Sequence, residues 1–132
     1  MVANMIAIDT NIVVRFLVRD DEAQWVRVCA LIRDRAVYVP ASVVLETAWV
    51  LRSVHGYSRL ELCEGLEQFF GLPNVSVETP ERFAFTFDWV RKGLDFADAL
   101  HLAASEGCER LLTFDRAFAQ RSRGAVPKVA KL

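Results

Sequence analysis

Short apolar runs alternate along this chain with longer segments in which apolar residues recur at helical spacing. This alternation is typical of a fold in which helices pack on a sheet of parallel strands. The runs that we assign to strands cover residues 5–8, 37–39, 75–77 and 110–113. A last run, at 126–129, contains Pro127, which suits an edge strand because proline has no backbone N–H. The sequence therefore predicts an α/β fold with a parallel sheet.

Capping residues mark the starts of several predicted helices. Asp20 or Asp21 precedes a helical segment and is placed to cap it. Ser58 and Glu61 have the spacing of a capping box, in which each side chain binds the other residue's backbone N–H. Asp95 is the expected N-cap of a helix that runs to residue 105. These signals fix where the helices begin between the strands.

The composition excludes several classes of protein. The 132 residues are 53% hydrophobic and 25% charged, with a net charge of −1, which is a globular balance and not that of a polycation or a disordered chain. We expect one domain over residues 1–132. No apolar run approaches a membrane span or a signal peptide, so we expect a soluble, cytoplasmic protein. Three cysteines without a C-x-x-C pair and only two histidines argue against a zinc site; we expect the cysteines to be buried free thiols.

Four acidic residues are placed where ligands bind in parallel α/β sheets. Asp9 ends the first strand, Asp115 follows the fourth, and Asp98 lies in the first turn of the helix that Asp95 begins. Glu46 lies in an apolar stretch of a helix expected over 42–54. The carboxyl ends of parallel strands meet at one edge of the sheet, so we expect these acids to converge. Taken singly, each acid has a structural alternative, as a helix cap or a solvated position.

A cluster of carboxylates without a neighbouring lysine is explained by a divalent cation that neutralises it. Oxygen ligands without histidine or cysteine favour Mg²⁺ or Mn²⁺ over Zn²⁺. A cation held in this way suits phosphate chemistry, because it polarises a phosphodiester oxygen, activates water and stabilises the leaving oxygen. No serine or cysteine nucleophile is then required.

Four segments of the chain resemble the PIN-domain family, and within it the VapC-type toxins, the ribonuclease halves of bacterial toxin–antitoxin pairs. The resemblance covers almost the whole chain in order and spacing, and it is carried by 8–12, 45–51, 95–100 and 112–116, with further likeness at 15–21 and 37–40. It implies a three-layer α/β/α sandwich with a central, mainly parallel sheet of four to five strands. It also implies cleavage of RNA phosphodiester bonds, inhibition by a cognate antitoxin and a homodimer.

The resemblance assigns roles to individual residues. Those that match the family's catalytic, Mg²⁺- or Mn²⁺-binding acids are Asp9, Glu46, Asp98 and Asp115. Those that match its polar residues beside the metal and the attacking water are Thr10, Asn11 and Thr113. Asp95 matches an acid found in only part of the family, so a helix cap and a water-mediated metal contact both stay open for it.

Basic and aromatic residues complete the set of candidates. Residues 116–132 carry five basic residues and no acidic side chain, which suits either RNA phosphates or a solvated surface. Arg116 and Arg15 are candidate substrate contacts, although Arg15 also has Asp20 and Asp21 as partners in an ion pair. The three tryptophans occupy helical-stripe positions that suit the core, and one or two of them suit a partner surface instead: Trp25, Trp49 and Trp89.

Two other functions are alternatives to a metal-dependent endoribonuclease. A phosphoryl-receiver signalling domain has a similar length and also gathers aspartates at strand ends. Here, however, Asp9 is followed by Thr10 and Asn11, where a receiver has an acidic pair, and Pro127–Lys128 reverses the Lys-Pro step of a receiver. A PIN-like module that binds RNA without cutting it is the second alternative, and a metal-binding measurement separates it from an enzyme.

Overall fold

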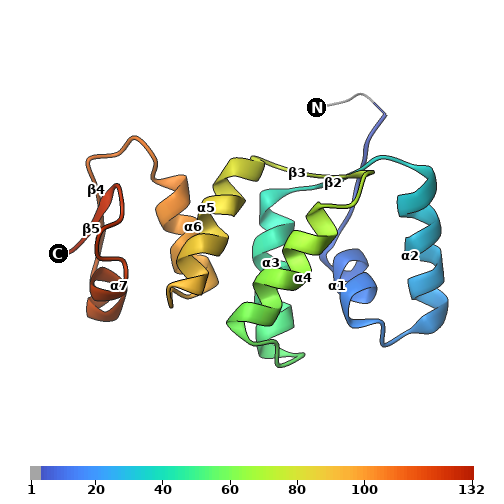
Figure 1. Cartoon of the computed structure of the whole chain (residues 1–132), viewed down its shortest axis with the longest axis horizontal. Helices are drawn as coiled ribbons and strands as arrows, with labels where there is room; N and C mark the ends of the chain where they lie inside the picture. The colour runs from blue at the N-terminus through green and yellow to red at the C-terminus, as the bar shows by residue number, and fades with distance from the viewer. Residues whose placement is uncertain (1–3) are drawn as a thin grey trace. The chain divides into compact units, whose positions relative to one another are not determined.

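The computed structural model describes residues 4–132, which alternate between strands and helices as the sequence predicts. Figure 1 shows this order along the chain. The strands are β1 (Ile6–Ala7), β2 (Val37–Val39), β3 (Val75–Val77), β4 (Arg110–Thr113) and β5 (Lys128–Lys131). The helices are α1 (Thr10–Val18), α2 (Glu22–Asp34), α3 (Ala41–Ser53), α4 (Arg59–Phe70), α5 (Pro80–Arg91), α6 (Phe96–Ala104) and α7 (Arg116–Arg121).

The chain forms two compact units, residues 1–80 and residues 81–132. The first unit contains a parallel sheet in the order β1-β2-β3, with Val37 of β2 opposite Ile6 on one side and Val75 on the other. The second unit contains the parallel pair β4-β5. The fold is therefore mixed α/β with parallel strands, as expected. Its five strands form a three-stranded and a two-stranded sheet, where a single sheet of four to five strands was expected. A single domain over residues 1–132 stays a prediction.

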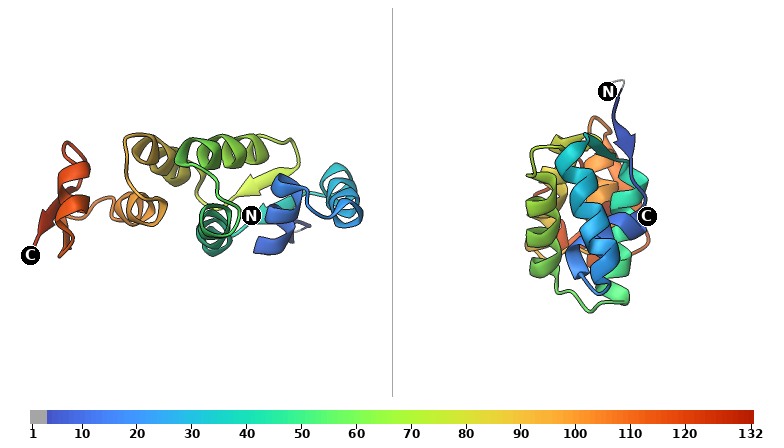
Figure 2. Two further views of the ribbon diagram at one scale, coloured as in Figure 1. Left: turned by 90° about the horizontal axis from the view of Figure 1, so that it is seen from below. Right: turned by 90° about the vertical axis from the view of Figure 1, so that its right-hand side faces the viewer.

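Four helices of the first unit pack in sequence next to the sheet. Helix α2 contacts α1, α1 contacts α3, and α3 contacts α4, which also contacts β3. Figure 2 shows these helices side by side. Their contact faces are fully buried aliphatic and aromatic side chains, among them Val13, Val44, Leu51, Leu66 and Phe69. Burial of these side chains holds α1 and α3 in fixed positions relative to each other.

The second unit has a helical part and a small sheet. Phe96 of α6 packs against Phe83 and Phe87 of α5, with ring centroids 6.4 and 6.2 Å apart. Strands β4 and β5 are connected through α7, which contacts both of them. The crossover brings Leu111 opposite Val129 and Thr113 opposite Lys131. Strand β5 begins at Lys128, directly after Pro127, and not at residue 126 as predicted. Proline has no backbone N–H to donate to β4, so the strand begins after it.

Most predicted helix caps are confirmed. The Asp21 side chain accepts a hydrogen bond from Gln24 N, and Ser58 and Glu61 form the expected capping box. Asp95 is the N-cap residue of α6 as predicted, and its side chain makes no capping hydrogen bond within the described residues. The three cysteines are free as expected, but only Cys63 is buried, while Cys29 is half-buried and Cys108 is exposed. No helix in residues 4–132 combines the length and the apolar character of a membrane span.

Candidate functional site

An acidic hollow of about 300 Å³ lies in the first unit. It is lined by Asp9, Thr10, Asn11, Val14, Arg15, Glu46, Val50 and His55. The predicted site residues of the first 80 positions are thus brought together, although they come from α1 and α3 and from separate stretches of sequence. Asp9, Asn11 and Glu46 are exposed, so their oxygen atoms are accessible from solvent.

Local structure explains why Asp9 and Glu46 face the same hollow. Asp9 follows β1 and is the N-cap of α1, where its Oδ1 accepts a hydrogen bond from Thr10 N at 2.8 Å. The hydroxyl of Thr10, a buried residue, donates to Oε1 of Glu46 across 36 positions of sequence. One threonine therefore contacts both carboxylates, and it does so from the first turn of a helix, whose positive dipole end favours negative charge.

Glu46 owes its position to the start of α3. Pro40 is the N-cap of this helix and provides no side-chain hydrogen bond to it. Instead, Oε1 of Glu78, which follows β3, accepts from Ala41 N and from the hydroxyl of Tyr38, both at 3.3 Å. Because Glu46 lies in the second turn of the same helix, this contact connects the helix that carries Glu46 to the end of β3.

The predicted acids of the second unit also gather at helix starts. Asp115 is the N-cap of α7, and its Oδ1 accepts from Ala117 N at 2.9 Å and Phe118 N at 3.2 Å. Asp115 N donates to the hydroxyl oxygen of Thr113 at the end of β4. Asp98 lies in the first turn of α6, partly buried, three residues after the exposed Asp95. Asp9 and Asp115 therefore both cap helices, as their structural alternatives predicted. Each of them keeps a carboxylate oxygen that can still bind a ligand.

The surroundings of Asp98 shift the pKa of its carboxyl group. Burial raises the pKa of its carboxyl group above the ordinary value, and the negative charges of Asp95 and then Asp115 raise this pKa further, while His101 lowers it. A carboxylate that is partly desolvated beside like charges is more stable when a cation lies next to it. His101 is itself exposed on α6, one turn after Asp98.

The donor chemistry fits a hard cation, although the described residues hold no complete cage for one. All candidate ligands are carboxylate oxygens, which suit Mg²⁺ or Mn²⁺. Asp9 and Glu46 belong to the first unit, and Asp98 and Asp115 to the second. Within residues 4–132, no three side chains of the His, Cys, Asp and Glu types are grouped closely enough to hold a metal ion. The convergence of all four acids on one ion stays a prediction.

The predicted basic contacts are accessible. Arg15 lines the acidic hollow, and its Nη1 lies 3.3 Å from Asp20, which confirms the ion pair weighed for it. Arg116, the first residue of α7, is exposed beside Asp115. The other basic residues of 116–132 are exposed as well: Arg121, Arg123, Lys128 and Lys131. The segment thus presents its positive charge to solvent, as either of its two interpretations requires.

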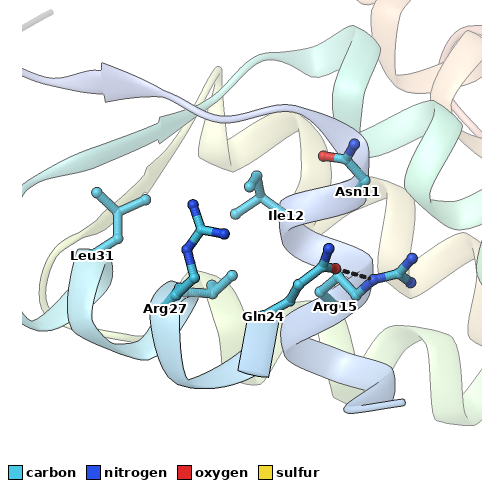
Figure 3. Close-up of a pocket in the computed structure, with 7 residues that line it drawn as sticks. Asn11, Ile12, Arg15, Gln24, Arg27 and Leu31 are labelled. Carbon is cyan, nitrogen blue, oxygen red and sulfur yellow. Dashed lines mark hydrogen bonds between the residues drawn. The ribbon is translucent and has the colours of Figure 1, made fainter. Parts of the chain in front are cut away.

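Sequence reasoning missed His55 as a residue of the acidic hollow. His55 follows the C-terminal end of α3, where its backbone N donates to Val50 O at 3.3 Å. Gly56 in the turn between α3 and α4 has a φ of 69° and marks where the helix ends, but it does not indicate that His55 lines the hollow. A second, adjoining hollow between α1 and α2 was also missed (Figure 3).

In each of the two parallel sheets an aspartate follows a strand end, Asp9 after β1 and Asp115 after β4. This arrangement is that of the class of α/β domains whose ligands bind at strand ends. The family model for the PIN domain matches residues 6–124, which spans both units, and the chain therefore belongs to the PIN domain family. PIN domains are a family of nucleases that generally depend on divalent metal ions. This match favours a nuclease over the receiver domain. No curated protein shows a significant match to the chain.

Proposed function

We propose that the protein is a Mg²⁺- or Mn²⁺-dependent endoribonuclease that hydrolyses RNA phosphodiester bonds. Its catalytic, metal-binding residues in this proposal are Asp9, Glu46, Asp98 and Asp115. One observation carries the proposal: two of these acids, from distant segments of a chain that matches the PIN family, line one hollow and are joined through Thr10. The bond from the Thr10 hydroxyl to Glu46 joins residues 36 positions apart and is not part of the capping of α1 by Asp9.

Each side chain has a defined task in this reaction. When bound, the cation supplies Lewis-acid stabilisation of the phosphate charge and makes water a stronger nucleophile. The four carboxylates hold the cation, while Thr10 keeps Glu46 in place. Asn11 and Thr113 are the polar residues placed beside the attacking water, and Asp95, whose side chain caps nothing within the described residues, contributes through water. Arg15 and Arg116 neutralise substrate phosphates.

The test is RNA cleavage by purified protein in Mg²⁺, in Mn²⁺ and in EDTA. We expect the wild type to cut RNA only with metal, and Asp9→Asn to be slower by at least about a hundredfold. Asp88→Asn is the matched control, because Asp88 is an exposed acid on α5 outside the site, and it should cut RNA as the wild type does. Equal cleavage by Asp9→Asn, or no cleavage with either metal, would contradict the proposal. RNA binding without cleavage would indicate the non-catalytic alternative.

We further propose that the enzyme is the toxin of a toxin–antitoxin pair, acts in the cytoplasm on cellular RNA, and forms a homodimer. The support is the resemblance of its motif segments to VapC-type toxins. Induced expression in bacteria should arrest growth for the wild type and not for Asp9→Asn, and co-expression of a small protein encoded by the adjacent gene should restore growth. Light scattering after size-exclusion chromatography measures the oligomeric state. Growth that continues despite active ribonuclease would contradict the toxin role and leave the nuclease intact.

A further inference from the structure

The hollow between α1 and α2 adjoins the acidic hollow. This α1–α2 groove has a volume of about 400 Å³ and is lined by Asn11, Ile12, Arg15, Gln24, Arg27, Val28 and Leu31. Asn11 and Arg15 line both hollows, so a ligand bound over the carboxylates reaches the groove past these two residues. The groove is within the usual size range of sites for small ligands.

The groove combines positive charge with apolar walls. Its lining contains two arginines, two amides and three aliphatic side chains, and it contains no acid. Figure 3 shows Arg27 extending from α2 into the space between the helices, with Ile12 of α1 across from it and Leu31 alongside. This charge is opposite to that of Asp9 and Glu46 in the adjoining acidic hollow. A ligand that fits both hollows has a cation-binding phosphate at one end and another anionic group at the other.

Neither arginine is committed to a strong partner. Arg27 is exposed and makes no ion pair or hydrogen bond of its side chain among the described residues. Arg15 donates from Nε to Oε1 of Gln24 at 2.6 Å, which orients its guanidinium group. Its ion pair with Asp20 joins side chains that are 34% and 45% exposed, and such surface pairs contribute little, so a phosphate competes for Arg15 readily.

We propose that the α1–α2 groove is a binding site for the nucleotide next to the scissile phosphate of a single-stranded RNA, with the phosphate of that nucleotide on Arg27. A nucleotide has both features that the groove provides for: an anion for the guanidinium groups and a flat, largely apolar base. The base lies against Ile12, Val28 and Leu31, and Gln24 and Asn11 are within reach of its polar edge. This inference rests on the proposed nuclease function and adds to it the subsite that orients the RNA strand.

The first test measures RNA binding without cleavage. A short, labelled single-stranded RNA is titrated in EDTA with the wild type, with Arg27→Gln and with the control Arg33→Gln. Arg33 lies on the same helix, is exposed and pairs with Asp34 outside the groove. We expect Arg27→Gln to raise the Kd roughly threefold to tenfold and to reduce the slope of log K against log salt by about 0.7, the value for one phosphate contact on a single strand. Arg33→Gln should change neither quantity.

A second test locates the contact along the strand. Single phosphates of the same RNA are replaced by neutral methylphosphonates. Wild-type binding should weaken at one position next to the cleavage site, and Arg27→Gln should be insensitive at that position. In the cleavage assay, Arg27→Gln should raise KM with little change in kcat, because the subsite binds substrate away from the reacting atoms.

The outcomes separate this inference from the proposed function. If the wild type cuts RNA and Arg27→Gln has the same Kd, salt slope and KM as Arg33→Gln, the subsite is overturned and the nuclease function is not. Arg27-dependent RNA binding without cleavage in any metal overturns the nuclease and, with it, the place of the groove beside a scissile phosphate, and it leaves only a groove that binds RNA. A wild type that neither binds nor cuts RNA overturns both. Binding of a polyglutamate peptide is measured with the same proteins. If Arg27→Gln binds RNA as the wild type does but loses affinity for the peptide, the groove binds an acidic protein segment, and the subsite is overturned.

Discussion

The hydroxyl of Thr10 donates a hydrogen bond to Oε1 of Glu46 and so joins the first turn of α1 to the second turn of α3. Thr10 is buried and Glu46 is exposed, so the fixed partner of this bond is the threonine. Its backbone N also donates to Asp9. The relative position of the two carboxylates in the acidic hollow therefore depends on one residue between them.

Thr10→Val should separate positioning from stability. The substitution keeps the shape of the side chain and removes the hydroxyl, so we expect about 1 kcal/mol less free energy of unfolding and about tenfold slower RNA cleavage. Thr10→Ser keeps the donor and should retain most of the activity. The matched control is Thr86→Val, which removes another buried hydroxyl that donates to Arg82 O at 2.8 Å. It should cost stability without slowing cleavage. Equal cleavage rates for Thr10→Val and Thr86→Val would show that Thr10 does not position Glu46.

The contact of Glu78 with the start of α3 gives a second prediction. Glu78→Ala removes the acceptor for Ala41 N and the hydroxyl of Tyr38, and the loss should lower the free energy of unfolding by about 1 kcal/mol. Glu78→Gln keeps an acceptor oxygen and should lose less. Urea denaturation measures both changes, with Glu64→Ala on the exposed side of α4 as the control. An unfolding midpoint for Glu78→Ala equal to that of Glu64→Ala would show that Glu78 does not cap α3.

Three strands were predicted to the residue, at 37–39, 75–77 and 110–113, because each short run is followed closely by proline or by a helix-capping aspartate. The first strand, expected over 5–8, is shorter and covers Ile6–Ala7. The last strand was displaced by two residues at its start because the N–H that Pro127 lacks counts for more than the apolar pattern. Nothing in a local pattern specifies which strands share hydrogen bonds, so the division into two sheets could not be read from the sequence.

Site residues marked by motifs were predicted, and those brought in by tertiary packing were not. Asp9 and Glu46 were expected together on grounds of topology, yet the bond through Thr10 depends on how α1 packs on α3. Trp49 shows that helical spacing alone does not determine whether a side chain is buried. The tryptophans were expected in the core, with a surface position as the alternative for one or two of them; Trp49 is 64% exposed and follows the alternative. Trp89 is buried as expected.

Metal binding provides a test of whether the four acids act on one cation. A ligand that binds only the folded protein, at a hundredfold excess over its Kd, raises the free energy of unfolding by about 2.7 kcal/mol. We expect Mn²⁺ to stabilise the wild type and Asp88→Asn in this way, and to give much smaller shifts with Asp9→Asn and Asp98→Asn. Thermal unfolding in Mn²⁺ and in EDTA measures the difference. A full shift for Asp98→Asn with none for Asp9→Asn would mean that the two units do not share a metal.

The environment of Asp98 predicts a pH dependence of stability in EDTA. Burial, assisted by the charges of Asp95 and Asp115, raises the pKa of Asp98 in the folded protein above its ordinary value of 3.8. The folded state therefore binds this proton more tightly than the unfolded state does. The resulting stabilisation is complete below the unfolded pKa and is lost as the pH rises through the folded pKa.

Asp98→Asn has no such proton to lose, so its advantage in stability over the wild type should be smallest near pH 4 and should grow to a plateau toward pH 7. Urea unfolding of both proteins across this range, with Asp88→Asn as a control that should show no such growth, measures the effect. An advantage that is constant with pH would show that the Asp98 carboxyl group titrates alike in the folded and unfolded chains. The unfavourable burial of the Asp98 charge beside Asp95 and Asp115, which a bound cation is expected to offset, would then be absent.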